Sequence, residues 1–153
     1  MKSIKFVLIS VLFFVSSTHA QDSQPQPVPQ PPVQQQPSEL LVGHWAAENI
    51  FYQQGLEIHT AFDFTTTSMT LIGLCIFPFG EPRQIEARVT APVTFNGNEF
   101  IVLESRSSTS QVGDRYCRTY VQPARWQFYF NGTGKAILIA PAPYNTQLVL
   151  VRE

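Results

Sequence analysis

The chain has 153 residues, of which 44% are hydrophobic and 14% are charged, and its formal net charge is −1. This length suits a single domain of common size. Nucleic-acid binding requires clustered positive charge that neutralises phosphates. A slightly acidic chain without a basic stripe therefore excludes nucleic acid as an expected partner.

Residues 1–20 are predicted to form a signal peptide. Lys2 and Lys5 precede an apolar run at 6–15, and the sequence THA at 18–20 places small residues at both cleavage-recognition positions. The apolar run is too short to cross a bilayer of about 30 Å as a helix, so no transmembrane anchor is expected. No cysteine near the cleavage position provides for a lipid. We therefore expect a bacterial-type exported protein that is periplasmic or secreted.

The next segment, residues 21–38, contains six prolines and seven glutamines. Such a composition cannot bury enough apolar surface to fold, and proline favours the extended polyproline II conformation. We predict a disordered linker here, and a tether or a proline-rich ligand is the alternative. The folded domain is expected to span 39–153.

The domain begins with a glycine and a tryptophan close together. Ser38 is expected to cap one helical turn through 39–42, and Gly43 then lets the chain bend sharply. Trp45 would plug the bottom of the domain. An ordinary core tryptophan is the alternative, and it would also be buried.

The rest of the chain alternates short apolar runs with turn residues, and no helical period persists. Strands are predicted at 43–52, 56–65, 68–77, 84–95, 99–105, 115–122, 125–131, 135–140 and 146–152. Sequential short strands joined by tight turns favour an all-β fold, namely one antiparallel up-and-down β-barrel of 8–9 strands. A two-sheet β-sandwich is the alternative.

The sequence Gly43-His44-Trp45 resembles the G-x-W motif of the lipocalin and wider calycin group. In that group the tryptophan packs beneath an arginine from a late strand. The resemblance implies a calycin-like barrel whose plug consists of Trp45 and Arg152, with Arg125 as the second candidate for the arginine.

Cys75 and Cys117 are the two cysteines of the chain. In an exported protein such a pair is expected to form one disulfide. A reactive or metal-binding thiol pair is the alternative, but the C-x-x-C spacing that favours it is absent.

Catalytic and metal-binding residues are sparse in the predicted domain. His44 and His59 fall on different predicted strands, and Asp63 lies too far along its strand to orient His59. His44, His59 and Glu48 would bind a metal only if the fold gathered them. We therefore predict no catalytic site, no metal and no cofactor.

Two segments have unusual compositions. Both faces of the strand within 69–79 are apolar, so one face requires a covering loop, a partner or a ligand. The segment 105–126 is rich in arginine and aromatic residues, which suit protein interfaces and also anionic or sugar ligands. The candidate binding surface comprises Arg106, Arg115, Tyr116, Arg118, Tyr120, Arg125 and Trp126. A solvated hairpin with extended arginines is the alternative.

These features predict a binding protein and not an enzyme. The first hypothesis is a barrel that holds a small apolar molecule inside it or at its mouth. The alternative is a protein-binding module, such as a periplasmic or secreted protease or lysozyme inhibitor, or a structural envelope protein. The 12 phenylalanines of the chain either fill the barrel or line a cavity, and this difference separates the hypotheses.

Overall fold

The computed structural model describes residues 36–143 and 145–153, which form one short helix and eleven strands. The predicted signal peptide and residues 21–35 of the predicted linker lie outside the described residues. In chain order the elements are α1 (Pro37–Leu41), β1 (Gly43–Ala47), β2 (Phe51–Gln53), β3 (Leu56–Phe64), β4 (Ser68–Ile76), β5 (Gln84–Asn96), β6 (Glu99–Val102), β7 (Arg106–Val112), β8 (Arg115–Val121), β9 (Ala124–Phe130), β10 (Lys135–Ile139) and β11 (Gln147–Arg152).

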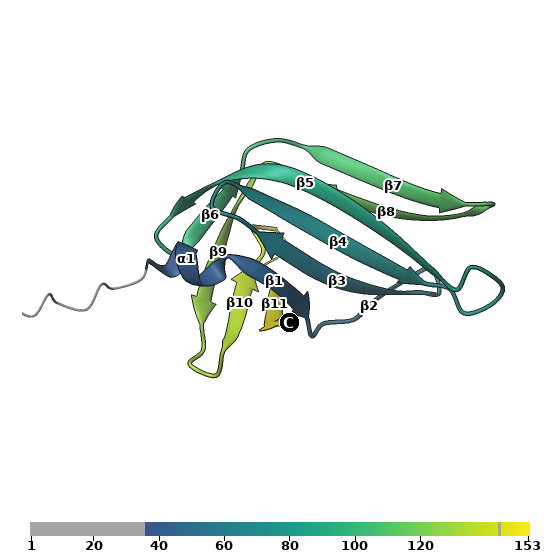
Figure 1. Ribbon diagram of the computed structural model, residues 1–153, viewed down its shortest axis with the longest axis horizontal. Coiled ribbons are helices and arrows are strands. Elements are labelled where there is room, and N and C mark those ends of the chain that lie inside the picture. The colour runs from purple at the N-terminus through teal and green to yellow at the C-terminus, as the bar shows by residue number, and fades with distance from the viewer. Residues whose placement is uncertain (1–35, 144) are drawn as a thin grey trace, which may run out of the picture. The chain divides into compact units, whose positions relative to one another are not determined.

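Eight strands close into an antiparallel barrel. Their order is β1-β11-β10-β9-β6-β5-β4-β3, and β3 pairs back to β1. Strand β2 pairs only with β3 and is an additional strand, and β7 and β8 form a separate two-stranded sheet (Figure 1). The closed barrel confirms the predicted fold class, and the sandwich alternative is wrong.

Alternation of side chains determines which face of each strand lines the interior. On β5 the side chains of Ile85, Ala87 and Val89 are buried, and those of Glu86 and Arg88 between them are exposed. Successive side chains of a strand point to opposite faces, so the apolar set packs in the interior, under the hairpin or inside the barrel, while the polar set faces water. This alternation is why most predicted strands match the observed ones closely.

The predicted strand at 43–52 is in fact two strands, β1 and β2. The residues between β1 and β2 are hydrogen-bonded to β11. Glu48 N donates to Val149 O at 2.8 Å, and Val149 N donates to Asn49 Oδ1 at 2.9 Å. Strand β1 therefore joins β11, and the chain then returns to pair with β3 as β2.

Strand β7 was not predicted, because its sequence, RSSTSQV, has no apolar alternation. It pairs with β8, and this β7–β8 hairpin lies against β4 and β5 (Figure 1). The predicted strand at 99–105 ends at Val102, where the chain leaves the barrel to form the hairpin. Strand β6 then pairs with β9, so the hairpin is an insertion in an otherwise sequential barrel.

The helix starts at Pro37, so the predicted domain boundary at residue 39 falls inside it. The expected cap by Ser38 is wrong, because the N-cap position is occupied by Gln36 and no side chain caps it. Proline fits the first turn, since its φ is already helical and it has no N–H group that needs a partner there. Gly43, which follows the helix, has φ +129° and makes the expected bend into β1.

The interior contains two apolar groups of unequal size. The larger, which we call the barrel core, includes Trp45, Phe62, Phe64, Phe100 and Phe128. The smaller, which we call the hairpin cluster, consists of four buried residues and two partly buried ones; they are Cys75, Ile85, Ala87, Cys117, Ile58 and Phe77. The barrel core lies inside the closed barrel, and the hairpin cluster lies between β8 and strands β4 and β5.

Candidate functional site

One end of the barrel is closed by helix α1, Trp45 and Arg152. The Trp45 side chain is 2% exposed, and its Nε1 donates to Leu41 O at 2.7 Å. The Arg152 guanidinium lies 4.7 Å from the Trp45 ring and donates to Leu40 O at 2.6 Å and to Val42 O at 3.2 Å. The last carbonyls of the helix, which have no partner within the helix, are thereby satisfied. The contact between Trp45 and Arg152 is the one that the G-x-W resemblance implies.

Aromatic side chains fill the interior above this closed end. Strand β9 directs Trp126, Phe128 and Phe130 inward, and Phe130 packs 6.1 Å from Trp45 between ring centroids. Phe100 on β6 stacks on Trp126 at 5.9 Å with an angle of 5° between the rings. Phe100 also meets Phe128 at 6.4 Å. The half of the barrel next to α1 is therefore solid.

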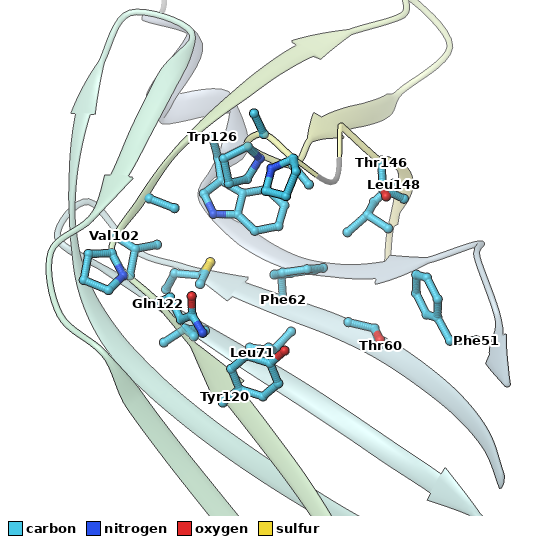
Figure 2. Close-up of a pocket in the computed structure, with 18 residues that line it drawn as sticks. Phe51, Thr60, Phe62, Leu71, Val102, Tyr120, Gln122, Trp126, Thr146 and Leu148 are labelled. Atoms are coloured by element: carbon cyan, nitrogen blue, oxygen red, sulfur yellow. The ribbon is translucent and has the colours of Figure 1, made fainter. Parts of the chain in front are cut away.

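The opposite end of the barrel holds a cavity of about 630 Å³. Its apolar wall includes Phe62, Met69, Leu71, Val102, Trp126 and Leu148. Figure 2 shows Phe62, Leu71 and Trp126 around the same space. None of the described residues that line the cavity carries a charged side chain. We call this space the mouth pocket.

The rim of the mouth pocket is built from loops. Residues 120–124, where the β7–β8 hairpin returns to the barrel, form one side, and residues 140–143 before β11 form another. Thr60, Tyr120 and Gln122 bring polar groups to this rim (Figure 2). The pocket thus has an apolar wall and a few polar groups at its opening.

The hairpin is attached to β4 covalently and by close packing. Cys75 on β4 and Cys117 on β8 form a disulfide, with 5.7 Å between their Cα atoms. A Cβ atom added at Gly73 would lie 2.6 Å from Cγ2 of Thr119. A side chain at Gly73 would force Thr119 or the strand that carries it to shift, so glycine allows β8 to lie close to β4.

The apolar segment 69–79 has its inner face covered, first by the barrel core and then by the hairpin. Met69 and Leu71 line the barrel, and Cys75 on the same face lies beneath the hairpin. On the opposite face Ile72 is buried, and Leu74 and Ile76 are half-buried. The hairpin therefore packs on the part of the inner face beyond the barrel core. It does not pack on the outer face.

The seven residues of the predicted binding surface do not form one patch. Tyr116, Arg118 and Tyr120 share the exposed face of β8. Arg115 lines the same cavity as these three residues, where it donates to Pro82 O and lies over Phe77. The other three lie elsewhere: Arg106 pairs with Glu104, Arg125 pairs with Glu99 on the outer face of β9, and Trp126 lines the mouth pocket.

A second cavity of about 430 Å³ lies beside the exposed face of β8. Ile58 and Phe77 form part of its wall, and Tyr116, Arg118 and Tyr120 form another part. Tyr120 lines this cavity and also the mouth pocket, so the two spaces adjoin at this side chain. We call this second space the side pocket.

The two histidines among the described residues, His44 and His59, lie on the outer surface of the barrel. His44 Nδ1 is hydrogen-bonded to Asp63, which faces it across the β1–β3 pairing, and His44 Nε2 lies 3.3 Å from Glu153. His59 Nε2 lies 2.5 Å from Glu57 on the same strand. The pair of His44 and Asp63 could have been found from the sequence only with the register of β1 against β3 in hand.

Within residues 36–143 and 145–153, no group of three or more His, Cys, Asp or Glu side chains is placed to hold a metal ion. In the same part of the chain, every helix is too short or too polar to cross a membrane.

No family model, curated protein or solved structure matches this chain. The resemblance to the lipocalin and calycin group thus has no support from these comparisons. It is supported only by architecture, namely the closed eight-stranded antiparallel barrel. The chain is a small β-barrel with an aromatic interior and one open end.

Proposed function

We propose that this protein is an exported binding protein that holds a small apolar molecule at the mouth of its barrel. The observation that carries the proposal is the mouth pocket of about 630 Å³, whose described lining has no charged side chain. Pockets for small molecules commonly measure about 300–1,000 Å³ and combine an apolar wall with a few polar groups. The aromatic floor and polar rim of the mouth pocket fit this pattern.

Two further observations support a role in binding outside the cytoplasm. The disulfide between Cys75 and Cys117 is typical of proteins from oxidising compartments. Together with the predicted signal peptide, it favours a periplasmic or secreted protein. His44 and His59 lie outside the lining of the mouth pocket, so binding without chemistry is the proposed activity.

The test fills the pocket and measures the uptake of an apolar fluorescent probe. Thr60 lines the mouth pocket from β3, and Thr60→Phe adds a bulky ring there on a strand that tolerates aromatic residues. We expect probe affinity to fall on the order of tenfold or more. Thr90→Phe, the same substitution at an exposed site on β5, is the matched control. The proposal is wrong if the wild-type protein shows no saturable uptake, or if both variants bind as it does.

A second candidate function is a protein-binding module, such as a protease or lysozyme inhibitor. The observation that favours it is the exposed face of β8, where Tyr116 and Tyr120 are 56% and 59% exposed on either side of Arg118. Tyrosine and arginine are enriched among the residues that dominate interface energies. A pull-down from the cell envelope or medium should then lose its partner with Tyr116→Ala or Arg118→Glu, while probe uptake stays unchanged. If neither assay responds, a structural envelope protein is the remaining alternative.

A further inference from the structure

Arg118 differs from the other lysines and arginines of the described residues, because no hydrogen bond or ion pair holds its guanidinium. The others all have a partner. Arg83, Arg88, Arg106, Arg125 and Lys135 pair with glutamates, and Arg115 and Arg152 donate to backbone carbonyls. The exposed face of β8 therefore carries a positive charge that makes no ion pair within the described residues.

The position of this charge relates it to the mouth pocket. Arg118 lines the side pocket, and Tyr120, two residues further along β8, lines both pockets. Alternate residues of a strand lie about 7 Å apart on one face. A molecule that fills the mouth pocket and continues past Tyr120 therefore reaches Arg118 after a short further distance.

We propose that the ligand of the mouth pocket is an amphiphile with an anionic end. Its apolar body lies in the barrel mouth, and Arg118 binds its acidic group in the side pocket. This inference rests on the proposed function and names the class of ligand. The guanidinium presents a planar set of donors that matches the oxygens of a carboxylate or phosphate. Tyr116 and Tyr120 flank Arg118 on the same face of β8.

Two further charges in the side pocket restrict the acidic group. The Asp114 carboxylate and the Arg115 guanidinium also line that pocket, and Arg115 donates to Pro82 O. With Arg118, the lining carries a net charge of +1, which a singly charged carboxylate balances and a doubly charged phosphate exceeds. The ligand is therefore expected to resemble a chain carboxylic acid more than a phosphate monoester.

The experiment compares ligands that share one apolar chain and differ at the end. Dodecanoate, dodecanol, dodecyl phosphate and dodecyltrimethylammonium compete with the apolar fluorescent probe for wild-type protein and variants. We expect dodecanoate to bind about tenfold more tightly than dodecanol, as a charge-assisted hydrogen bond provides. Dodecyl phosphate should bind more weakly than dodecanoate.

Arg118→Gln should remove the preference for dodecanoate and leave the affinity for dodecanol unchanged. Arg118→Glu should reverse the preference in favour of dodecyltrimethylammonium. Arg88→Gln makes the same charge change on the outer face of β5, where Arg88 pairs with Glu86, and should behave as wild type. Because Arg118 is exposed, its substitution should leave the melting temperature nearly unchanged.

The outcomes separate the inference from the proposed function. If dodecanol and dodecanoate bind equally to wild type, or if Arg118→Gln keeps the preference for dodecanoate, the proposed role of Arg118 is wrong. The proposal that the mouth pocket binds an apolar molecule is not contradicted by that result. If dodecyl phosphate binds more tightly than dodecanoate, the assignment to a carboxylate is wrong. If neither dodecanol nor the probe binds, the proposed function itself is wrong.

Discussion

The barrel core and the hairpin cluster share two strands, β4 and β5, and are stabilised by different means. Strand β4 supplies Met69 to the barrel core and Cys75 to the hairpin cluster, and β5 supplies Ala91 and Ile85 in the same order. The barrel core is held by large aromatic side chains in mutual contact. The hairpin cluster has fewer residues and contains one covalent bond, the disulfide between Cys75 and Cys117.

This difference follows from how much apolar surface each region can bury. Strand β7 is almost entirely polar, so of the two hairpin strands only β8 contributes to the hairpin cluster, through Cys117. The disulfide joins residues 42 positions apart in the sequence. In the chain-entropy model, closing such a loop stabilises the folded state by about 4 kcal/mol. A cross-link of this strength compensates for a cluster that is too small to hold the hairpin by packing.

The largest effect is expected at the aromatic closure of the barrel. Trp45→Ala should lower the free energy of unfolding by about 5 kcal/mol, the upper end for large aromatic truncations, because the contacts to Leu41 and Arg152 are lost with the ring. Chemical denaturation measures this value. A loss below about 1 kcal/mol would mean that the barrel core does not depend on its closed end.

The next effect tests the covalent attachment of the hairpin. Replacing both Cys75 and Cys117 by alanine should cost about 4 kcal/mol. Hydrogen exchange should show that the β7–β8 amides lose protection before those of β9 and β10. Uniform loss of protection in both regions would contradict the division into two separately stabilised groups. Intact mass measured under non-reducing conditions confirms the bond in the wild-type protein.

A smaller effect is expected from the packing contact beneath the hairpin. Gly73→Ala places a methyl group against Thr119 and should cost about 2 kcal/mol, as overpacking does. Thr119→Ser removes the facing methyl group, so the double variant should regain much of the loss. Additive effects of the two substitutions would show that the hairpin is not seated on Gly73.

The smallest effect concerns the hydroxyl group of Thr119. Its Oγ1 is buried and has no hydrogen-bond partner among the described residues. Thr119→Val keeps the shape of the side chain and removes the unsatisfied group, so stability should rise by up to about 1 kcal/mol. A marked loss of stability in thermal unfolding would show that the hydroxyl group has a partner in solution.

The sequence predicts the barrel well because its strands bury one face. The alternation of Ile85, Ala87 and Val89 against charged neighbours requires an inside and an outside, whatever the partner strands are. The same reasoning misses β7, because its serines and threonines lie on a strand with no apolar face. Hydrophobic periodicity cannot identify a strand that has no apolar face and is held by pairing with its partner strand.

The candidate site is less predictable than the fold. Arg118 and Tyr120 belong to the binding surface predicted from composition, but the sequence does not show that Arg118 makes no ion pair within the described residues. The mouth pocket combines strand residues with the loops at 120–124 and 140–143. Strand order and the inserted hairpin determine which loops lie together at one end of the barrel. Neither can be predicted from local hydrophobic periodicity.

The pairing of β1 with β11 has a consequence for how the chain folds. Trp45 and Arg152 lie opposite each other in this pairing, so the barrel is closed by the first and the last of its strands. Contacts between distant parts of a chain form late, because the loop between them must first be closed. Until β11 arrives, β1 and β10 each keep an unpaired edge, and such edges promote aggregation. A chain synthesised from its N-terminus therefore cannot close the barrel until β11 has emerged from the ribosome.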